Sequence, residues 1–164
     1  SFFDAHMAMV QPDPPFALYT PKWPIFTRTR SLPPAQIIES QIRNSMVSEG
    51  SRIIGAIIED SVIGLRSKVR KGAKLKRVVM QGADYFDGER VKPGAENDSP
   101  GIDLGVGENS ILEDVIIDRN ARIGSNVIIT SKSGHPDYKG DSYYIRDGIV
   151  VIPRDAVIPD GTII

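Results

Sequence analysis

A six-residue pattern recurs along the chain and constrains its fold more than any other feature. Each copy starts with an aliphatic residue or Ala, and the next aliphatic residue follows six positions later. We identify six copies, at residues 47–53, 69–75, 106–112, 121–127, 151–157 and 157–163. A helical face would need apolar residues at positions i, i+3, i+4 and i+7. A period of six therefore excludes a helix and favours a short strand followed by a tight corner.

The fourth position of the pattern indicates where each corner lies. It holds, in chain order, Gly50, Gly72, Asn109, Gly124, Arg154 and Asp160. Gly, Asn and Asp adopt a positive φ more readily than other residues, as a tight corner requires. Three strands joined by such corners would form a triangular coil of roughly eighteen residues, and coils would stack about 4.8 Å apart around an aliphatic centre. We therefore predict an all-β fold, a parallel β-helix.

The repeats lie within residues 37–164, which we predict to form one β-helix domain with two excursions. Residues 81–105 and 131–146 interrupt the pattern and are rich in Gly, Pro and polar residues. Loops of this length usually carry function or leave the ordered scaffold. We expect both segments to leave the prism as loops.

Residues 1–36 differ from the rest of the chain. The first nine are predicted to be the end of a short amphipathic helix, with Phe2, Phe3 and Met7 on one face. Most of the twelve prolines fall within residues 11–36, and this density excludes a helix or a central strand. We predict an extended, Pro-rich arm. Its aromatic residues lead us to expect that it lies against another surface.

Composition excludes several classes of function. Twenty Lys and Arg residues are matched by twenty-one Asp and Glu residues, so no basic surface for nucleic acid is indicated. The longest aliphatic run, residues 149–152, is far shorter than the roughly twenty residues of a membrane span. With no Cys and two His, the chain cannot form a thiolate site or the three-histidine zinc site of a γ-type carbonic anhydrase. We predict no nucleic-acid partner, no membrane partner and no metal site.

His135 supports an enzymatic alternative. Acyltransferases built from hexapeptide repeats use a loop His as a general base and acetyl-CoA as the acyl donor. His135 lies in the second excursion, and Asp137 is its only apparent partner acid. Under this alternative, His135→Ala would abolish acyl transfer. A further alternative is a purely structural solenoid, whose melting temperature no phosphorylated compound would raise.

Five motifs indicate a family, three of them outside the simple repeat and two overlapping its copies. They are Tyr-Thr-Pro-Lys-Trp-Pro-Ile at 19–25, Ser-Leu-Pro-Pro-Ala at 31–35, Gly-Ala-Asp-Tyr at 82–85, Ile-Asp-Arg-Asn-Ala-Arg-Ile-Gly at 117–124 and Gly-Ile-Val-Val-Ile-Pro-Arg-Asp-Ala at 148–156. In this order they resemble the C-terminal domain of glucose-1-phosphate adenylyltransferase (ADP-glucose pyrophosphorylase). The resemblance implies that the β-helix is left-handed.

The resemblance also implies a parent enzyme that makes ADP-glucose and pyrophosphate from ATP and glucose 1-phosphate, for glycogen or starch synthesis. Its nucleotide loop, catalytic residues and Mg²⁺-binding carboxylates would lie in an upstream catalytic domain, to which residues 1–36 would link the β-helix. We therefore predict no catalytic residue and no cofactor in this chain, which alone would be inactive. The expected partners are that catalytic domain, the other subunits of a homo- or heterotetramer, and a small phosphorylated effector. The expected location is the bacterial cytoplasm or the plastid stroma.

Two effector-binding positions follow from the same resemblance. In the plant and cyanobacterial branch of the family, two lysines bind the activator, and the segments that contain them match Arg119 and Arg154 here. Both positions keep the positive charge, and guanidinium groups suit bidentate contacts with phosphate. Arg122, three residues after Arg119, is a further candidate. The domain is thus predicted to contribute to allosteric effector binding and to subunit contacts.

Overall fold

The computed structural model describes residues 1–15, 17–87 and 101–164. Within them the chain forms one helix, α1 (Phe2–Met9), and sixteen strands. The strands are β1 (Gln36–Ile38), β2 (Gln41–Arg43), β3 (Met46–Val47), β4 (Arg52–Ile54), β5 (Ile57–Glu59), β6 (Val62–Leu65), β7 (Lys68–Val69), β8 (Lys74–Gly82), β9 (Gly105–Val106), β10 (Ile111–Ile117), β11 (Arg122–Ile123), β12 (Ile128–Ile129), β13 (Tyr138–Lys139), β14 (Tyr144–Arg146), β15 (Ile149–Ile152) and β16 (Val157–Ile158).

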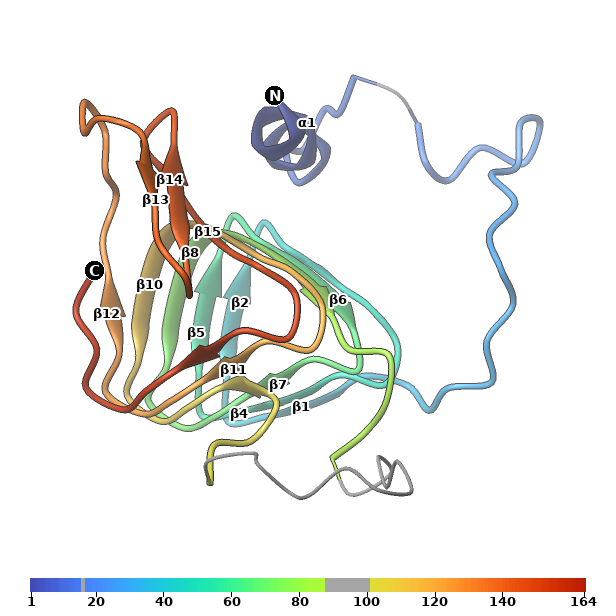
Figure 1. Cartoon of the computed structure of the whole chain (residues 1–164). Coiled ribbons are helices and arrows are strands. Elements are labelled where there is room, and N and C mark those ends of the chain that lie inside the picture. The colour runs from blue at the N-terminus through green and yellow to red at the C-terminus, as the bar shows by residue number, and fades with distance from the viewer. Residues whose placement is uncertain (16, 88–100) are drawn as a thin grey trace.

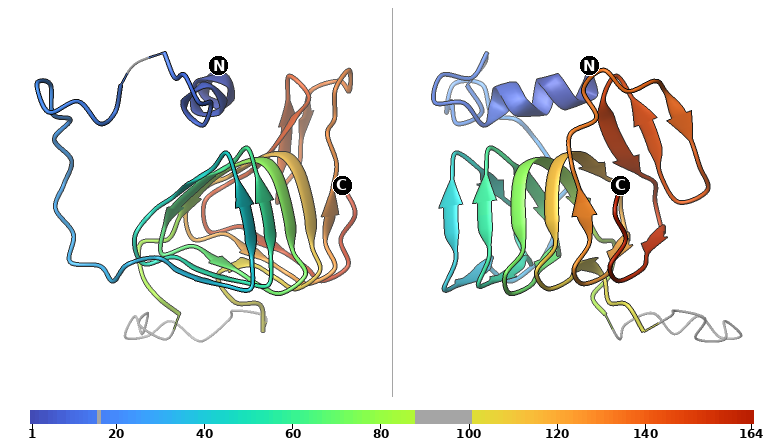
Figure 2. Two further views of the ribbon diagram at one scale, coloured as in Figure 1. Left: turned by 180° about the vertical axis from the view of Figure 1, so that it is seen from behind. Right: turned by 90° about the vertical axis from the view of Figure 1, so that its left-hand side faces the viewer.

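Most of these strands wind into a triangular prism, with the coils stacked along its axis (Figures 1 and 2). Strands of successive coils pair in parallel, as in the order β1-β4-β7-β9-β11-β16 along one side. Gln36 opposes Arg52, which opposes Lys68, so these coils contain 16 residues instead of the roughly eighteen expected. The coil is shorter because two of its three sides advance by five residues and only one by six. The predicted parallel β-helix is confirmed.

The register of the repeat agrees with the prediction in the first three copies. Gly50, Gly72 and Asn109 occupy corners with positive φ. In the last three copies the predicted corner position is wrong. There the positive-φ corners lie at Asn126, Asp155 and Gly161, not at Gly124, Arg154 and Asp160.

In the copies at 151–157 and 157–163 the side chains that point inward shift with these corners, whereas Ala121 and Val127 of the fourth copy are buried as predicted. Ile123, Ile152 and Ile158 are at most 1% exposed, whereas Ile163, which the pattern placed inside, is 76% exposed. Adjacent aliphatic residues such as Val151 and Ile152 fit either register of a six-residue pattern. The structure therefore assigns the register by burial where the aliphatic pattern is ambiguous.

The centre of the prism is a continuous column of aliphatic side chains. Its largest fully buried members include Ile53, Ile58, Ile63, Leu75, Leu112, Ile117, Ile123, Ile129, Ile152 and Ile158. At the corners, the hydroxyl groups of buried serines form hydrogen bonds with backbone groups that are not paired within the sheets. Ser61 Oγ donates to the carbonyl of Glu59 at 2.6 Å and accepts from the backbone N–H of Val78 in the next coil at 3.0 Å. Among the described residues, no buried side-chain nitrogen or oxygen lacks a hydrogen-bond partner.

Helix α1 packs on the outside of the prism (Figure 2). Phe3 and Met7 are buried there and form a small apolar cluster with Val79 of β8. Phe2, which the sequence placed on the same face, is 49% exposed, and its ring lies 4.2 Å from that of His6. The helix thus contacts the prism through one narrow apolar stripe.

The segment between α1 and β1 extends away from the prism (Figure 1). Its described residues contain no helix or strand. Tyr19, Trp23 and Phe26 are 87%, 81% and 90% exposed. No surface within the described part of the chain covers these three rings.

The excursion at 131–146 contains regular structure that the sequence did not predict. Strands β13 and β14 form an antiparallel hairpin, and β14 continues the sheet by pairing antiparallel with β15. Of the excursion at 81–105, residues 88–100 lie outside the described residues. On either side of them, β8 runs to Gly82 and β9 begins at Gly105.

Candidate functional site

Arg119 and Arg154, predicted as separate effector contacts, lie side by side on neighbouring coils. Strands β10 and β15 pair in parallel with Ile117 opposite Ile152. Each arginine follows its strand by two residues, so the shared register places both at the same corner of the prism. The backbone N–H of Asp155 donates to the carbonyl of Arg119 at 3.0 Å, which fixes the two corners together.

Asp84 joins this pair from a third coil. Its carboxylate accepts hydrogen bonds from Arg119 Nη1 at 2.8 Å and from Asn120 Nδ2 at 3.0 Å, and it also forms an ion pair with Arg154. The backbone N–H of Asp84 donates in turn to Asn120 Oδ1 at 2.9 Å. Asn120 is itself fixed, since it is 2% exposed and occupies a corner with positive φ. One carboxylate therefore bridges two guanidinium groups that come from different coils.

Sequence reasoning did not identify Asp84 as a site residue. It lies 35 residues before Arg119 and 70 before Arg154, and it belongs to no copy of the six-residue pattern. Its only signal was the Gly-Ala-Asp-Tyr motif, which marked the family without assigning a role to the carboxylate.

The environment of Asp84 favours its charged form. Burial by itself would raise the pKa of Asp84, but the hydrogen bonds from Asn120 and Arg119 and the charges of Arg154 and Arg119 outweigh it. The pKa of Asp84 therefore lies below its ordinary value of 3.8. At neutral pH the site contains an ionised carboxylate between two cations.

A depression of about 350 Å³ adjoins this cluster. Four arginines line it: Arg28 and Arg30 from the arm, and Arg66 and Arg119 from the prism, together with Asp84. The Arg66 guanidinium lies 5.5 Å from the centre of the Phe86 ring, and Arg66 Nη1 donates to the carbonyl of Ala83 at 3.3 Å. Within the described part of the chain, Arg28, Arg30 and Arg66 form no ion pair with a carboxylate. Such a depression is suited to an anion that offers several oxygen atoms.

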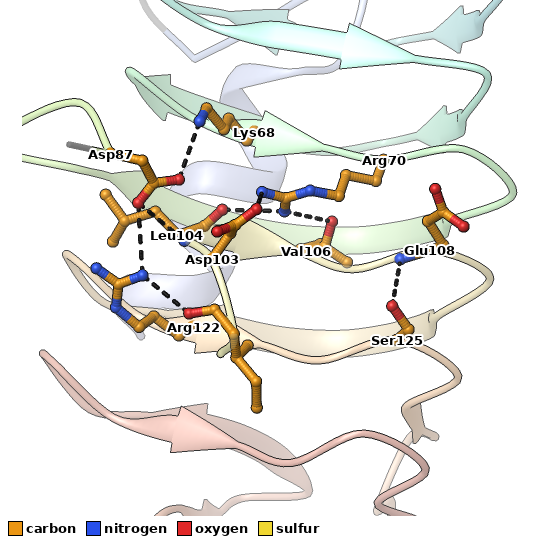
Figure 3. Close-up of polar contacts among 10 residues, drawn as sticks. Lys68, Arg70, Asp87, Asp103, Leu104, Val106, Glu108, Arg122 and Ser125 are labelled. Carbon is orange, nitrogen blue, oxygen red and sulfur yellow. Dashed lines mark hydrogen bonds and ion pairs between the residues drawn. The ribbon is translucent and has the colours of Figure 1, made fainter. Parts of the chain in front are cut away.

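Arg122, the third predicted effector residue, belongs to a different cluster (Figure 3). Arg122 Nη1 donates to the carbonyl of Ile102 at 2.9 Å and approaches Asp87 Oδ1 at 3.4 Å. Asp87 also pairs with Lys68 at 2.9 Å, and the side chain of Arg122 is only 17% exposed. The structure thus places Arg122 where it ties the two ends of the first excursion to the prism, apart from Arg119 and Arg154.

The surroundings of Asp87 also favour its charged form. Burial would raise the pKa of Asp87, but the hydrogen bonds from Lys68 and from the Leu104 backbone, with the charges of Lys68 and Arg122, lower it below 3.8. The Asp87 carboxylate is therefore ionised at neutral pH, and through Lys68 and Arg122 it holds the start of the first excursion on the prism.

His135 and Asp137, the residues of the acyltransferase alternative, have other partners. The Nδ1 of His135 lies 2.7 Å from the carbonyl of Pro136, and the residue is exposed. Asp137 approaches Arg146 at 3.7 Å and accepts a hydrogen bond from the Asp147 backbone at 3.3 Å. No hydrogen bond or ion pair joins His135 to a carboxylate among the described residues.

The described residues contain no group of three or more His, Cys, Asp or Glu side chains that could hold a metal ion. They also include no helix with the length and hydropathy needed to cross a bilayer.

Comparison with known proteins identifies the family. Residues 30–163 match the family model described as the GLGC left-handed parallel beta-helix domain. The chain belongs to this family. A maize (Zea mays) protein named glucose-1-phosphate adenylyltransferase large subunit 1, chloroplastic/amyloplastic, is 41% identical over 166 residues. The alignment covers all of this chain and 32% of the maize protein, so the chain spans about a third of the length of that relative.

The GLGC match bears directly on the sequence predictions. It confirms that the β-helix is left-handed. Together with the maize relative, it confirms the resemblance to glucose-1-phosphate adenylyltransferase. Residues 117–124 and 148–156, which contain Arg119 and Arg154, both fall within the matched region.

Proposed function

We propose that this chain is the regulatory and oligomerisation domain of a glucose-1-phosphate adenylyltransferase and that it binds a small phosphorylated effector through Arg119 and Arg154. The observation that carries the proposal is the juxtaposition of these two guanidinium groups beside a depression lined by further arginines. The similarity of the whole chain to the maize adenylyltransferase supports the class of the parent enzyme.

The chemistry of the cluster suits a phosphate group. The side chains of Arg119 and Arg154 are 42% and 53% exposed, so their donors can be reached from solvent while their stems stay on the prism. Guanidinium groups present paired N–H donors that match the spacing of phosphate oxygens. Arg28 and Arg30 add positive charge from the arm, so an effector would contact the β-helix and the segment that precedes it together.

In this proposal regulation works by linkage. An effector that binds Arg119 and Arg154 stabilises the arrangement of the parent enzyme that binds it more tightly. The shift cannot exceed the difference in effector affinity between the two arrangements. Nucleotide transfer and Mg²⁺ binding would belong to the parent's catalytic domain, which is this chain's expected partner together with the other subunits of a tetramer.

The first coil supports the oligomerisation part of the proposal. Strands β1, β2 and β3 each pair on one side only, with β4, β5 and β6, and within the described residues their outer edges are unpaired. Ile37 of β1 is 49% exposed. An unpaired edge with apolar residues readily pairs with another chain. Sedimentation of the wild-type chain and of Ile37→Lys would test this contact, since a charge on this edge should dissociate the oligomer.

Thermal melting tests the effector site. Inorganic phosphate, 3-phosphoglycerate, pyruvate and acetyl-CoA would each be added to the wild-type chain and to Arg119→Gln and Arg154→Gln. A phosphorylated ligand at about 100 times its Kd adds roughly 2.7 kcal/mol, which raises the melting temperature by roughly 5–10 °C for a chain of this size. Each substitution should remove most of this shift, because a hydrogen bond to a charged group contributes about 1.5–3 kcal/mol.

Arg146→Gln is the matched control. It removes an equally charged side chain that pairs with Asp137 on the hairpin, away from the Arg119 corner. The control should keep the full shift. A shift that survives in both Arg119→Gln and Arg154→Gln would contradict the proposed site, and a shift with acetyl-CoA alone would favour the acyltransferase alternative.

A further inference from the structure

The two arginines assigned to the effector already contact an anion supplied by the chain itself. The Asp84 carboxylate accepts from Arg119 and Asn120 and pairs with Arg154. An incoming phosphate would use the same guanidinium N–H groups, because these are the donors that Arg119 and Arg154 direct toward the corner. The phosphate and the Asp84 carboxylate are also both negative, so they would repel each other if both contacted the two arginines.

The position of Asp84 in the chain allows it to move. Strand β8 ends at Gly82, and the Ala83 backbone N–H still donates to the carbonyl of Leu65 at 2.8 Å. The Asp84 backbone N–H donates to Asn120 Oδ1 at 2.9 Å, and Lys68 and Arg122 hold Asp87 on the prism. The backbone is therefore fixed at and around Asp84, and the part that can move is its side chain. Its side chain is 32% exposed, so it can leave the arginines for solvent without unfolding a strand.

We propose that Asp84 is a built-in competitor of the effector, a carboxylate that occupies the anion position between Arg119 and Arg154 until a phosphorylated ligand displaces it. The inference rests on the proposed function, because it concerns the same two arginines. It assigns to the Gly-Ala-Asp-Tyr motif a role in setting effector affinity. It also implies that effector binding releases the Asp84 side chain from the corner.

Asp84→Asn tests the competition, with phosphate binding measured by isothermal titration calorimetry on the 164-residue chain. The amide keeps the shape of the carboxylate and removes its charge. We expect the Kd for inorganic phosphate to fall by roughly tenfold, since the ligand no longer displaces or faces a negative group. Asp103→Asn is the matched control, because it removes the same charge from an exposed carboxylate that pairs with Arg70 elsewhere on the prism. The control should leave the Kd within about twofold of the wild type.

A measurement on the wild type avoids dependence on the folding of the variant. The ¹³Cγ resonance of Asp84 reports whether its carboxylate is held by the arginines. On saturation with inorganic phosphate at pH 7, it should move to the position of a solvent-exposed ionised carboxylate, while the resonance of Asp103 stays in place. An Asp84 resonance that does not move when phosphate binds would overturn the competition.

The outcomes separate this inference from the proposed function. If phosphate binds neither the wild type nor Asp84→Asn, or if binding does not depend on Arg119 and Arg154, the effector site itself is wrong and the competition falls with it. If binding depends on both arginines but Asp84→Asn binds no more tightly than the wild type, the effector site stands and the competition is wrong. Asp84 would then be a residue that positions the two arginines for the ligand.

Discussion

The inward register of the later coils can be tested with two isoleucines whose burial is the reverse of what the six-residue pattern predicted, since that pattern placed Ile163 inside and Ile152 one residue after an inward position. Ile152 is fully buried and lies in register with Ile117 of the neighbouring coil, whereas Ile163 is 76% exposed. Ile152→Ala removes three buried carbon atoms and leaves a cavity between packed coils, a change that usually costs about 2–5 kcal/mol. For a chain of this size, that loss lowers the melting temperature by roughly 5–15 °C. Ile163→Ala should change stability by no more than about 0.5 kcal/mol.

Differential scanning calorimetry of the wild type and both variants would measure these differences directly. Because both substitutions remove the same atoms, side-chain chemistry cancels and the comparison depends on burial alone. A loss for Ile163→Ala equal to that for Ile152→Ala would mean that both side chains are buried to the same extent. The assignment of Asp155 and Gly161 to the corners would then be wrong.

Two further predictions concern the carboxylates and the coil spacing. The pKa values of Asp84 and Asp87 are lowered on folding, so both add stability that is complete above the ordinary pKa of 3.8 and is lost as pH falls through their lower folded values. Urea titrations at pH 7 and at about pH 3 should show a smaller acid-induced loss in Asp84→Asn than in the wild type, and an equal loss would contradict this account. A Cβ at Gly64 would lie 2.4 Å from the Gln81 carbonyl oxygen of the next coil, so Gly64→Ala should force the coils apart. The loss in thermal stability should clearly exceed that of Gly134→Ala, whose added Cβ meets no atom within 4 Å and which incurs only the roughly 1–2 kcal/mol cost of positive φ.

The fold was predictable because a stacked coil repeats its constraints. Positive-φ residues and aliphatic residues recur at fixed offsets, and Gly50, Gly72 and Asn109 are each at the corner that the offset predicts. The length of the first coils was not predictable, since two sides of five residues leave only one side of six residues in each of them. The hairpin of β13 and β14 also went unrecognised. The hairpin pairs with β15 through a tertiary contact, and residues 131–146 lack the alternating apolar and polar pattern that would predict a strand.

The candidate site shows where sequence reasoning succeeds and where it stops. Asn120 and Asp155 both occupy positive-φ corners, and Arg119 and Arg154 each precede such a corner by one residue. With the register set by these corners, the two arginines occupy equivalent positions of stacked coils, so their juxtaposition follows from the repeat. Asp84 has no equivalent position, because it lies where the chain leaves the prism after Gly82. The repeat of a solenoid therefore predicts which residues of stacked coils lie together. It does not predict the position of Asp84, because this carboxylate belongs to an excursion whose path is seen only in the folded chain.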